Sequence, residues 1–599
     1  MTVSRANSIR WGLAAALVTF LFGAEALAQS GPVKLAPPVS LQPPANQDDG
    51  EETASESPIK PLTPTEDARG VTGIQVDSLS AVNPETAGTL TPETGGFPLT
   101  LWQGTSRELV ERLLPEIPGR LASPTLRDLS RRMMLSMATP PAGEVGKDLL
   151  NIRIGRLAAM GDLLSVGQLI QSVPNRVAST ALVKAEADAY FLTSDYPKAC
   201  GIVGEQILES EEIYWRKAFV FCQALAGEHD KAYLGAQLMR DEGVDEPVFF
   251  SLVDAIASKG SASLETLEGA DALTIAMMRS AQAPLPENSI LPDSPSLLRA
   301  IAVSPYLPVK TRLRVAEWAE AAGSLDITAL RQIYGAVPFT EEDLEEPLNR
   351  ADELGSAMGR AILYQAALGR SIPAALIEVL VKANQLAETD GLMMTTARAF
   401  LPILKRIQPD NEMLPFASRA IRMYLMAGDV EAAAAWYRLI RSGAVFEDIY
   451  RTAYINLLPL ARIADGDDLI NVPTSFLSDW WRLNRGLSDG PEKAHLFFVL
   501  ANALESSVTK ARWYDLLQGN LQAAPRKSPP PPVWYALNDA AAQGRVGETL
   551  LYILLGMGSA APGEIEPMFL SGALKAMIAV GLENEARALA LEAALGAGL

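Results

Sequence analysis

Few residues of this chain have a type and spacing suited to chemistry, and the first of them are two cysteines. Cys200 and Cys222 are the only cysteines among 599 residues, and the 21 residues between them exclude a C-x-x-C redox motif. In an oxidising compartment such a pair forms a structural disulfide, whereas two buried thiols can also pack as small hydrophobic groups. The sequence leaves both arrangements open.

The histidines, serines and acidic runs do not form a catalytic or metal-binding pattern. His229 and His495 are too few for a histidine-based metal cluster, and no Gly-rich phosphate loop, G-x-S-x-G or zinc-protease pair occurs. The S-x-x-K strings at Ser57 and Ser507 lack the K-T-G of a penicillin-binding site, and the DGDD run from Asp465 lacks the ligand spacing of a calcium loop. We therefore expect no catalytic residue, no metal and no cofactor, and we predict that the chain is not an enzyme.

The charge balance is unfavourable for a nucleic-acid partner. The formal net charge is −20, so a phosphate backbone would be repelled unless a local basic patch reversed the field. Acidic runs such as EEDLEEP, from Glu341, are typical of solvated helix faces rather than of catalytic carboxylates. A protein or peptide partner is the better expectation.

The first 28 residues have the pattern of an export signal. Two arginines precede an apolar run over residues 11–23, and the small residues 26–28 form a cleavage site. A retained membrane anchor is the alternative, but Glu25 ends the apolar run short of the ~20 residues that span a bilayer. We expect cleavage after Ala28, no membrane span in the mature chain, and a periplasmic or secreted location.

Residues 29–96 differ in composition from the rest of the chain. They are rich in Pro, Thr, Ser, Asp and Glu, as in QPPANQDDGEETASESP. Such a segment cannot bury enough apolar surface to offset the entropy of ordering it. We expect a disordered tether here.

From residue 97 to the C-terminus the pattern is helical and, in part, periodic. Apolar residues recur three and four apart in short runs that end at Gly, Asp or Asn, which predicts antiparallel helix pairs. The breaks at Gly161, Ser194, Gly227 and Gly260 are each 33 residues apart. Equal spacing of this kind indicates a repeated helix pair.

The repeated unit resembles the tetratricopeptide repeat family, whose unit is a helix pair of about 34 residues with small residues where the two helices cross. The stretch AEADAYFLTSDYPKACGIVGEQIL carries the pattern at Ala187, Tyr190, Asp195, Tyr196 and Ala199. The resemblance is clear over about residues 147–260 and patchy afterwards. It implies an all-α fold of antiparallel helix-pair repeats stacked into a curved solenoid, preceded by the disordered tether.

Two Pro-rich segments divide the helical part of the chain. Proline density there predicts that helices stop and that the chain is extended. The expected organisation is a block of repeats similar to the tetratricopeptide type over 97–280, a Pro-rich crossing over 281–297, irregular helical repeats over 298–523, a second crossing over 524–533 and C-terminal helical repeats over 534–599.

The resemblance also implies where a partner would bind. Asn151, Lys184 and Lys217 share one column on the first helices of successive pairs, where the family lines its concave face, and Asp188 and Tyr214 lie nearby. Lysines in so acidic a protein favour an anionic partner segment, and ordinary solvated lysines are the alternative. The dicarboxylate clamp of the family does not carry over, because its other polar positions are apolar here.

The repeat register bears on the cysteines as well. It places Cys200 on the second helix of one pair and Cys222 on the first helix of the next. Adjacent helices pack at about 8–10 Å between axes, which is close enough for a disulfide between facing positions.

Two functions fit these observations. The first is an exported, noncatalytic scaffold or adaptor of a bacterial-type cell envelope, which binds a protein or peptide partner through a helical-repeat groove. The alternative is an accessory factor in peptidoglycan or envelope polysaccharide metabolism, similar to the superhelical part of lytic transglycosylases. An enzyme of that type would need a catalytic Glu in a separate globular fold, and no such segment is evident.

Overall fold

The computed structural model describes residues 83–173, 180–260, 262, 264, 270–285, 294–465, 470–504, 508–517 and 526–599. The export signal expected over residues 1–28 lies outside the described residues, as do most of the tether and the central part of the first Pro-rich crossing. All of the described residues belong to one compact unit.

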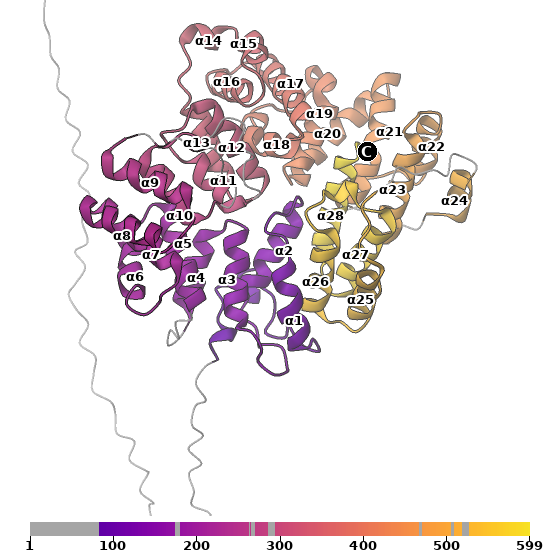
Figure 1. The fold of residues 1–599 in the computed structure, drawn as a ribbon. Helices are drawn as coiled ribbons and strands as arrows, with labels where there is room; N and C mark the ends of the chain where they lie inside the picture. The colour runs from indigo at the N-terminus through magenta and orange to yellow at the C-terminus, as the bar shows by residue number, and fades with distance from the viewer. Residues whose placement is uncertain are drawn as a thin grey trace, which may run out of the picture. The chain divides into compact units, whose positions relative to one another are not determined.

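The described residues form helices only, which confirms the predicted all-α fold of stacked helix pairs (Figure 1). They contain 28 α-helices and five short 3₁₀ helices, and no strand occurs among them. Buried apolar side chains form one continuous core along the helices. No helix in the described part of the chain is both long and apolar enough to cross a bilayer.

The first repeats follow the predicted 33-residue spacing. Consecutive helices pack as antiparallel pairs, and small buried residues such as Ala199 and Ala232 let the two helices of a pair approach closely. The helices of this block are α3 (Leu149–Ala159), α4 (Leu163–Ser172), α5 (Thr180–Thr193), α6 (Tyr196–Gln206), α7 (Ile213–Leu225), α8 (His229–Asp241) and α9 (Pro247–Ser258).

Two further helices pack against the first helices of these pairs. They are α10 (Ala272–Ala281), which contacts α5, α7 and α9, and α11 (Pro295–Ala302), which contacts α3 and α5. Arg279 of α10 donates to the carbonyl of Leu192 at the end of α5, at 3.3 and 3.2 Å. The chain therefore covers part of the face that the family resemblance assigned to a partner.

The middle of the chain continues the stack with helices of more variable length. The helices are α12 (Val309–Ala321), α13 (Ile327–Gly335), α14 (Glu341–Glu345), α15 (Pro347–Leu354), α16 (Ser356–Leu368), α17 (Pro373–Asp390), α18 (Met393–Leu404), α19 (Ala417–Met426), α20 (Val430–Gly443), α21 (Asp448–Asp465), α22 (Phe476–Asn484), α23 (Gly490–Ala503) and α24 (Lys510–Leu517). From α15 to α21 each helix packs against the next, as in the first block.

The C-terminal block corrects the predicted end of the second Pro-rich crossing. Its helices are α25 (Pro531–Ala542), α26 (Val546–Met557), α27 (Pro567–Ala579) and α28 (Glu583–Gly596). Residues 531–533, expected in the crossing, are the first turn of α25. Proline is tolerated there because the amide of a first-turn residue has no partner within the helix.

Turns with the same backbone conformation recur between the helices of the array, and they explain the regular spacing of breaks in the sequence. The residue before the N-cap of the second helix is left-handed in the first pairs, with φ of 80° at Gly161, 66° at Ser194 and 79° at Gly227. Glycine adopts this conformation without a steric penalty, and the turn satisfies the last carbonyls of the preceding helix. The same φ recurs at Gly323 and Gly428, so the structural repeat continues where the sequence spacing becomes irregular.

The N-terminal boundary of the helical part lies earlier than predicted. Residues 83–96, which we assigned to the tether, pack against α1 (Arg107–Leu113) and α2 (Pro124–Leu135). Glu85 pairs with Arg107 at 2.6 Å, and Ala87 is buried. Local composition does not predict that residues 83–96 are folded, because the residues that they contact are distant in the sequence.

The last helices pack against the first ones. Helix α2 contacts both α26 and α28, which lie beside it in Figure 1. Arg132 of α2 pairs with Glu585 of α28 at 2.6 Å. Glu592 of α28 accepts hydrogen bonds from the hydroxyl of Ser123 and, at 3.0 and 2.7 Å, from the amide and hydroxyl of Thr125. The described array is thus joined end to end.

Candidate functional site

The predicted partner column forms ion pairs within the chain. Lys184 Nζ lies 2.7 Å from Asp188 Oδ2 and 3.9 Å from the centre of the Tyr214 ring, and the Tyr214 hydroxyl donates to Asp188 Oδ1 at 2.7 Å. Burial raises the pKa of Asp188, against the effect of Lys184, and burial together with Asp188 raises the pKa of Tyr214. Three of the five predicted residues therefore form one cluster.

The other two residues of the column lie on neighbouring pairs. Lys217 on α7 pairs with Glu246 at 2.9 Å, and Asn151 is half-buried on α3. Both lysines of the column thus have a carboxylate of the chain as partner. Their charge is matched internally, and α10 packs against the helices α5 and α7 that carry them.

The two cysteines form a disulfide in the structure. Cys200 on α6 and Cys222 on α7 have their Cα atoms 5.7 Å apart. The bond links the second helix of one pair to the first helix of the next, so its effect is structural.

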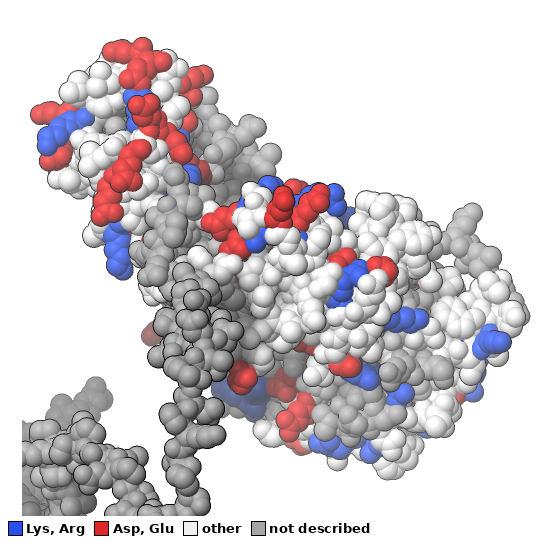
Figure 2. Space-filling view, turned by 90° about the horizontal axis from the view of Figure 1, so that it is seen from below, with Lys and Arg blue, Asp and Glu red and all other residues white. Residues whose placement is uncertain are grey.

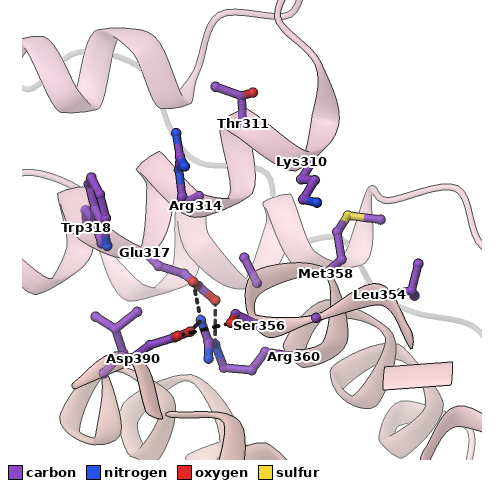
Figure 3. Close-up of a pocket in the computed structure, with 13 residues that line it drawn as sticks. Lys310, Thr311, Arg314, Glu317, Trp318, Leu354, Ser356, Met358, Arg360 and Asp390 are labelled. Carbon is purple, nitrogen blue, oxygen red and sulfur yellow. Dashed lines mark hydrogen bonds and ion pairs between the residues drawn. The ribbon is translucent and has the colours of Figure 1, made fainter. Parts of the chain in front are cut away.

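A cavity of about 430 Å³ lies between α12 and the beginning of α16, and we call it the smaller cavity (Figure 3). The end of α17 closes one side of it. Charged, aromatic and aliphatic side chains line it together: Lys310, Thr311, Arg314, Glu317, Trp318, Leu354, Gly355, Ser356, Ala357, Met358, Arg360, Asp390 and Leu392.

One edge of the smaller cavity is a basic and aromatic stripe on α12. Lys310, Arg314 and Trp318 are spaced by four residues, which places them on one helix face, and all three side chains are exposed. The Arg314 guanidinium lies 5.6 Å from the centre of the Trp318 ring. Among the described residues, neither Lys310 nor Arg314 has a carboxylate partner.

The floor of the smaller cavity is a buried charge network around Arg360. Its Nε and Nη2 donate to Glu317 at 2.7 and 2.6 Å, and Nη2 also lies 2.7 Å from Asp390. The Tyr334 hydroxyl donates to Glu317 at 2.6 Å. Although burial disfavours the charged guanidinium, the bonds to Glu317 raise the pKa of Arg360. Arg360 Nη1 is buried and has no hydrogen-bond partner in the structure.

The beginning of α16 presents unpaired amides to the smaller cavity. Gly355 precedes the helix with φ of 72°, and no side chain caps the first turn. The amides of Ser356, Ala357 and Met358 have no acceptor among the described residues. The Ser356 hydroxyl is turned instead to Asp390, at 3.0 Å.

A larger cavity of about 600 Å³ adjoins the smaller one and shares Trp318, Asp390 and Leu392 with it. Its lining comes from three distant parts of the chain: residues 120–127, residues 318–426 and residues 559–596. Met393, Met394 and Met426 are among its apolar lining residues. The larger cavity therefore exists because the last helices pack near the first ones.

Two arginines of the larger cavity are held by the protein in different ways. Arg127 Nη1 donates to three carbonyls, and burial together with the nearby Arg398 lowers the pKa of Arg127 to about 10. Arg398 pairs with Glu320 at 2.8 Å. Arg127 has no carboxylate partner in the described part of the chain.

The charge of the two cavities is opposite to that of the protein as a whole. The chain carries a net charge of −20, and Figure 2 shows a dense group of acidic side chains at one end of the face drawn there. The cavity linings instead contain twice as many basic as acidic side chains, namely Lys310, Arg314, Arg360, Arg120, Arg127 and Arg398 against Glu317, Asp390 and Glu592.

Sequence reasoning found neither cavity. The spacing of Lys310, Arg314 and Trp318 was a usable signal, because it places two cations and an indole on one face of a predicted helix. The remaining walls come from helices whose packing order the sequence does not specify. Among the described residues, no group of three or more His, Cys, Asp and Glu side chains could hold a metal ion.

No protein-family model, curated protein or solved structure matches this chain significantly.

Proposed function

We propose that this chain is an exported, noncatalytic scaffold that binds a segment of a protein or peptide partner in the two adjoining cavities. The observation that carries the proposal is the excess of basic side chains in the cavities of a strongly acidic protein. Unpaired cations such as Lys310 and Arg314 favour an anionic ligand, because electrostatic complementarity guides binding and excludes partners of the wrong sign.

The size and lining of the cavities support a peptide ligand. Volumes of about 430 and 600 Å³ fall within the range of roughly 300–1,000 Å³ that is usual for ligand sites. Met393, Met394 and Met426 offer flexible, polarizable surface, which adapts to apolar side chains of different shape. An extended segment with apolar residues and a negative charge fits this combination.

Two observations support export to the cell envelope or beyond. The first residues have the pattern of an export signal, and Cys200 and Cys222 are bonded, as is usual for proteins of oxidising compartments. The location is tested by fractionating cells that express the full chain. Recovery with cytoplasmic markers would contradict export.

Peptide binding is tested with the purified full chain and fluorescein-labelled random octapeptides, followed by fluorescence anisotropy. We expect saturable binding that Ser559→Trp weakens at least tenfold, because this exposed residue lines the larger cavity and the indole would fill it. Gln237→Trp, at an exposed position of α8, is the matched control and should bind like the wild type. Equal binding by all three proteins would contradict a site in the cavities.

Peptidoglycan binding is the second proposal from the sequence, and a sedimentation assay with purified peptidoglycan separates it from the first. Co-sedimentation that Ser559→Trp does not change, without binding of any octapeptide, would favour the accessory role in envelope polysaccharide metabolism.

A further inference from the structure

We propose that the smaller cavity is a carboxylate site that holds the free C-terminus of a peptide whose last side chain is apolar. This inference rests on the proposed function and specifies which end of the ligand is recognised, and by which groups.

The beginning of α16 supplies the oriented donors for such a group. The free amides of Ser356, Ala357 and Met358 lie at the positive end of a 13-residue helix. A carboxylate is one of the anions that such amides bind, because its two oxygens can accept from adjacent N–H groups. Glycine at position 355 leaves the approach to the first turn without a side chain.

A buried donor without a partner is an independent indication of a ligand. The Arg360 side chain is 1% exposed and lines the smaller cavity, yet its Nη1 makes no hydrogen bond. A buried donor without an acceptor costs about 1–3 kcal/mol, and more if it is charged. A ligand oxygen that reached Nη1 after a small movement of the surrounding side chains would remove this cost, whereas Nε and Nη2 are already held by Glu317 and Asp390.

The basic stripe on α12 supplies the positive charge that attracts a carboxylate. Lys310 and Arg314 line the smaller cavity and have no carboxylate partner among the described residues, so both are available to an incoming anion (Figure 3). Their side chains are exposed at the rim. A ligand would meet these cations before it reaches the amides of α16.

The balance of charge distinguishes a carboxylate from a phosphate. The lining holds three basic and two acidic side chains, and the helix end adds roughly half a positive charge. Against this total of about +1.5, a carboxylate would leave about half a positive charge near Glu317 and Asp390, which is favourable. A phosphate dianion would leave about half a negative charge near the same two carboxylates, which is unfavourable.

The apolar lining accounts for the rest of the ligand. Trp318, Leu354, Met358 and Leu392 surround the space next to the donors, which suits an apolar side chain on the residue that bears the carboxylate. Trp318 and Leu392 also line the larger cavity, so the preceding residues of the peptide have a continuous path toward the methionines there.

The test compares two pools of fluorescein-labelled octapeptides that differ only at the C-terminus. Both pools have the last three positions randomised among Leu, Ile, Val, Phe and Met; one ends in a free carboxylate and the other in an amide. We expect the full chain to bind the acid pool at least tenfold more tightly, which is the effect of losing one hydrogen bond to a charged group.

Single substitutions at the rim then connect the preference to the site. Arg314→Gln and Lys310→Gln should each weaken binding of the acid pool about tenfold and leave the amide pool unchanged. Both positions are exposed, so the variants should fold normally. Lys231→Gln removes an exposed cation of α8 far from the cavity lining and should change neither pool.

Each failure has a distinct meaning. Equal binding of acid and amide pools would overturn the carboxylate site and leave peptide binding intact. Absence of binding by either pool, and by the fully random octapeptides, would overturn the proposed function as well. Competition by inorganic phosphate that is stronger than competition by acetate would overturn the choice of a carboxylate.

Discussion

The amide of Gly547 donates to the carbonyl of Leu101 at 3.0 Å, which joins helix α26 to a segment near the start of the described chain. The contact is so close that it requires glycine. A β-carbon at position 547 would lie 2.7 Å from the Leu101 carbonyl oxygen and 2.6 Å from the Trp102 ring. The contact between the two ends of the array thus requires glycine, the residue without a β-carbon, at position 547.

Replacing this glycine should destabilise the protein. We expect Gly547→Ala to lower the free energy of unfolding by about 1–3 kcal/mol, because the backbone or Trp102 must move. Gly572→Ala in α27 is the control, since its β-carbon would meet its nearest neighbour at an ordinary 3.5 Å and alanine favours the helix by up to ~1 kcal/mol. Denaturant unfolding of both variants checks this, and equal effects would contradict it.

The pH dependence of stability should change in Glu592→Gln. Burial raises the pKa of Glu592, against the hydrogen bonds from Ser123 and Thr125. The folded state therefore favours the protonated acid, and this contribution is present below the unfolded pKa of about 4.5 and is lost as the pH rises through the folded pKa. Glutamine does not titrate, and its single carbonyl oxygen can still accept the two bonds from Thr125, although its amide nitrogen cannot accept from Ser123.

We expect the melting temperature of Glu592→Gln, relative to the wild type, to increase between pH 4.5 and pH 8. Thermal melts at several pH values measure this difference. A constant or decreasing difference would show that Glu592 is ionised in the folded protein as easily as in the unfolded chain.

The network below the smaller cavity should be sensitive to loss of its cation. Arg360→Met leaves Glu317 and Asp390 without their partner and should cost about 3–5 kcal/mol of unfolding free energy. Tyr334→Phe removes one hydrogen bond to Glu317 and should cost only about 1–2 kcal/mol. Denaturant unfolding ranks the two variants, and a smaller loss for Arg360→Met would contradict a charged network.

Reduction of the disulfide should loosen the junction of α6 and α7. The bond closes a loop between residues 22 apart in sequence, which corresponds to about 3 kcal/mol in the chain-entropy model. We expect dithiothreitol to lower the melting temperature of the wild type to that of the Cys200→Ser, Cys222→Ser double variant. An unchanged melting temperature would mean that packing alone holds the two helices.

The repeat could be predicted because its cause is local. Gly161 and Gly227 adopt a conformation that favours glycine, so the turn leaves a regular mark in the sequence. The contacts that join the last helices to the first ones have no regular sequence pattern. Ser123 and Glu592 are 469 residues apart, and neither position differs from an ordinary surface residue in sequence.

The candidate site likewise combines a local contact that the sequence predicts with tertiary contacts that it does not predict. Lys184 and Asp188 are four residues apart on one helix, a spacing that predicts an ion pair, although the family resemblance assigns both residues to a partner groove. Arg360 meets Glu317 only because α16 packs against α12, and its unpaired donor is a product of that packing. A tertiary contact of this kind has no signature in one sequence.

The contact of α28 with α2 restricts how this protein can change in length. In an open array a helix pair can be duplicated or deleted with little effect on distant pairs, because each unit touches only its neighbours. Here an added pair would displace Glu592 from Ser123 and Thr125 by about the width of a helix, roughly 10 Å. Gain or loss of a single helix pair would therefore break these contacts, whereas substitutions and changes in the loops between helices would leave them in place.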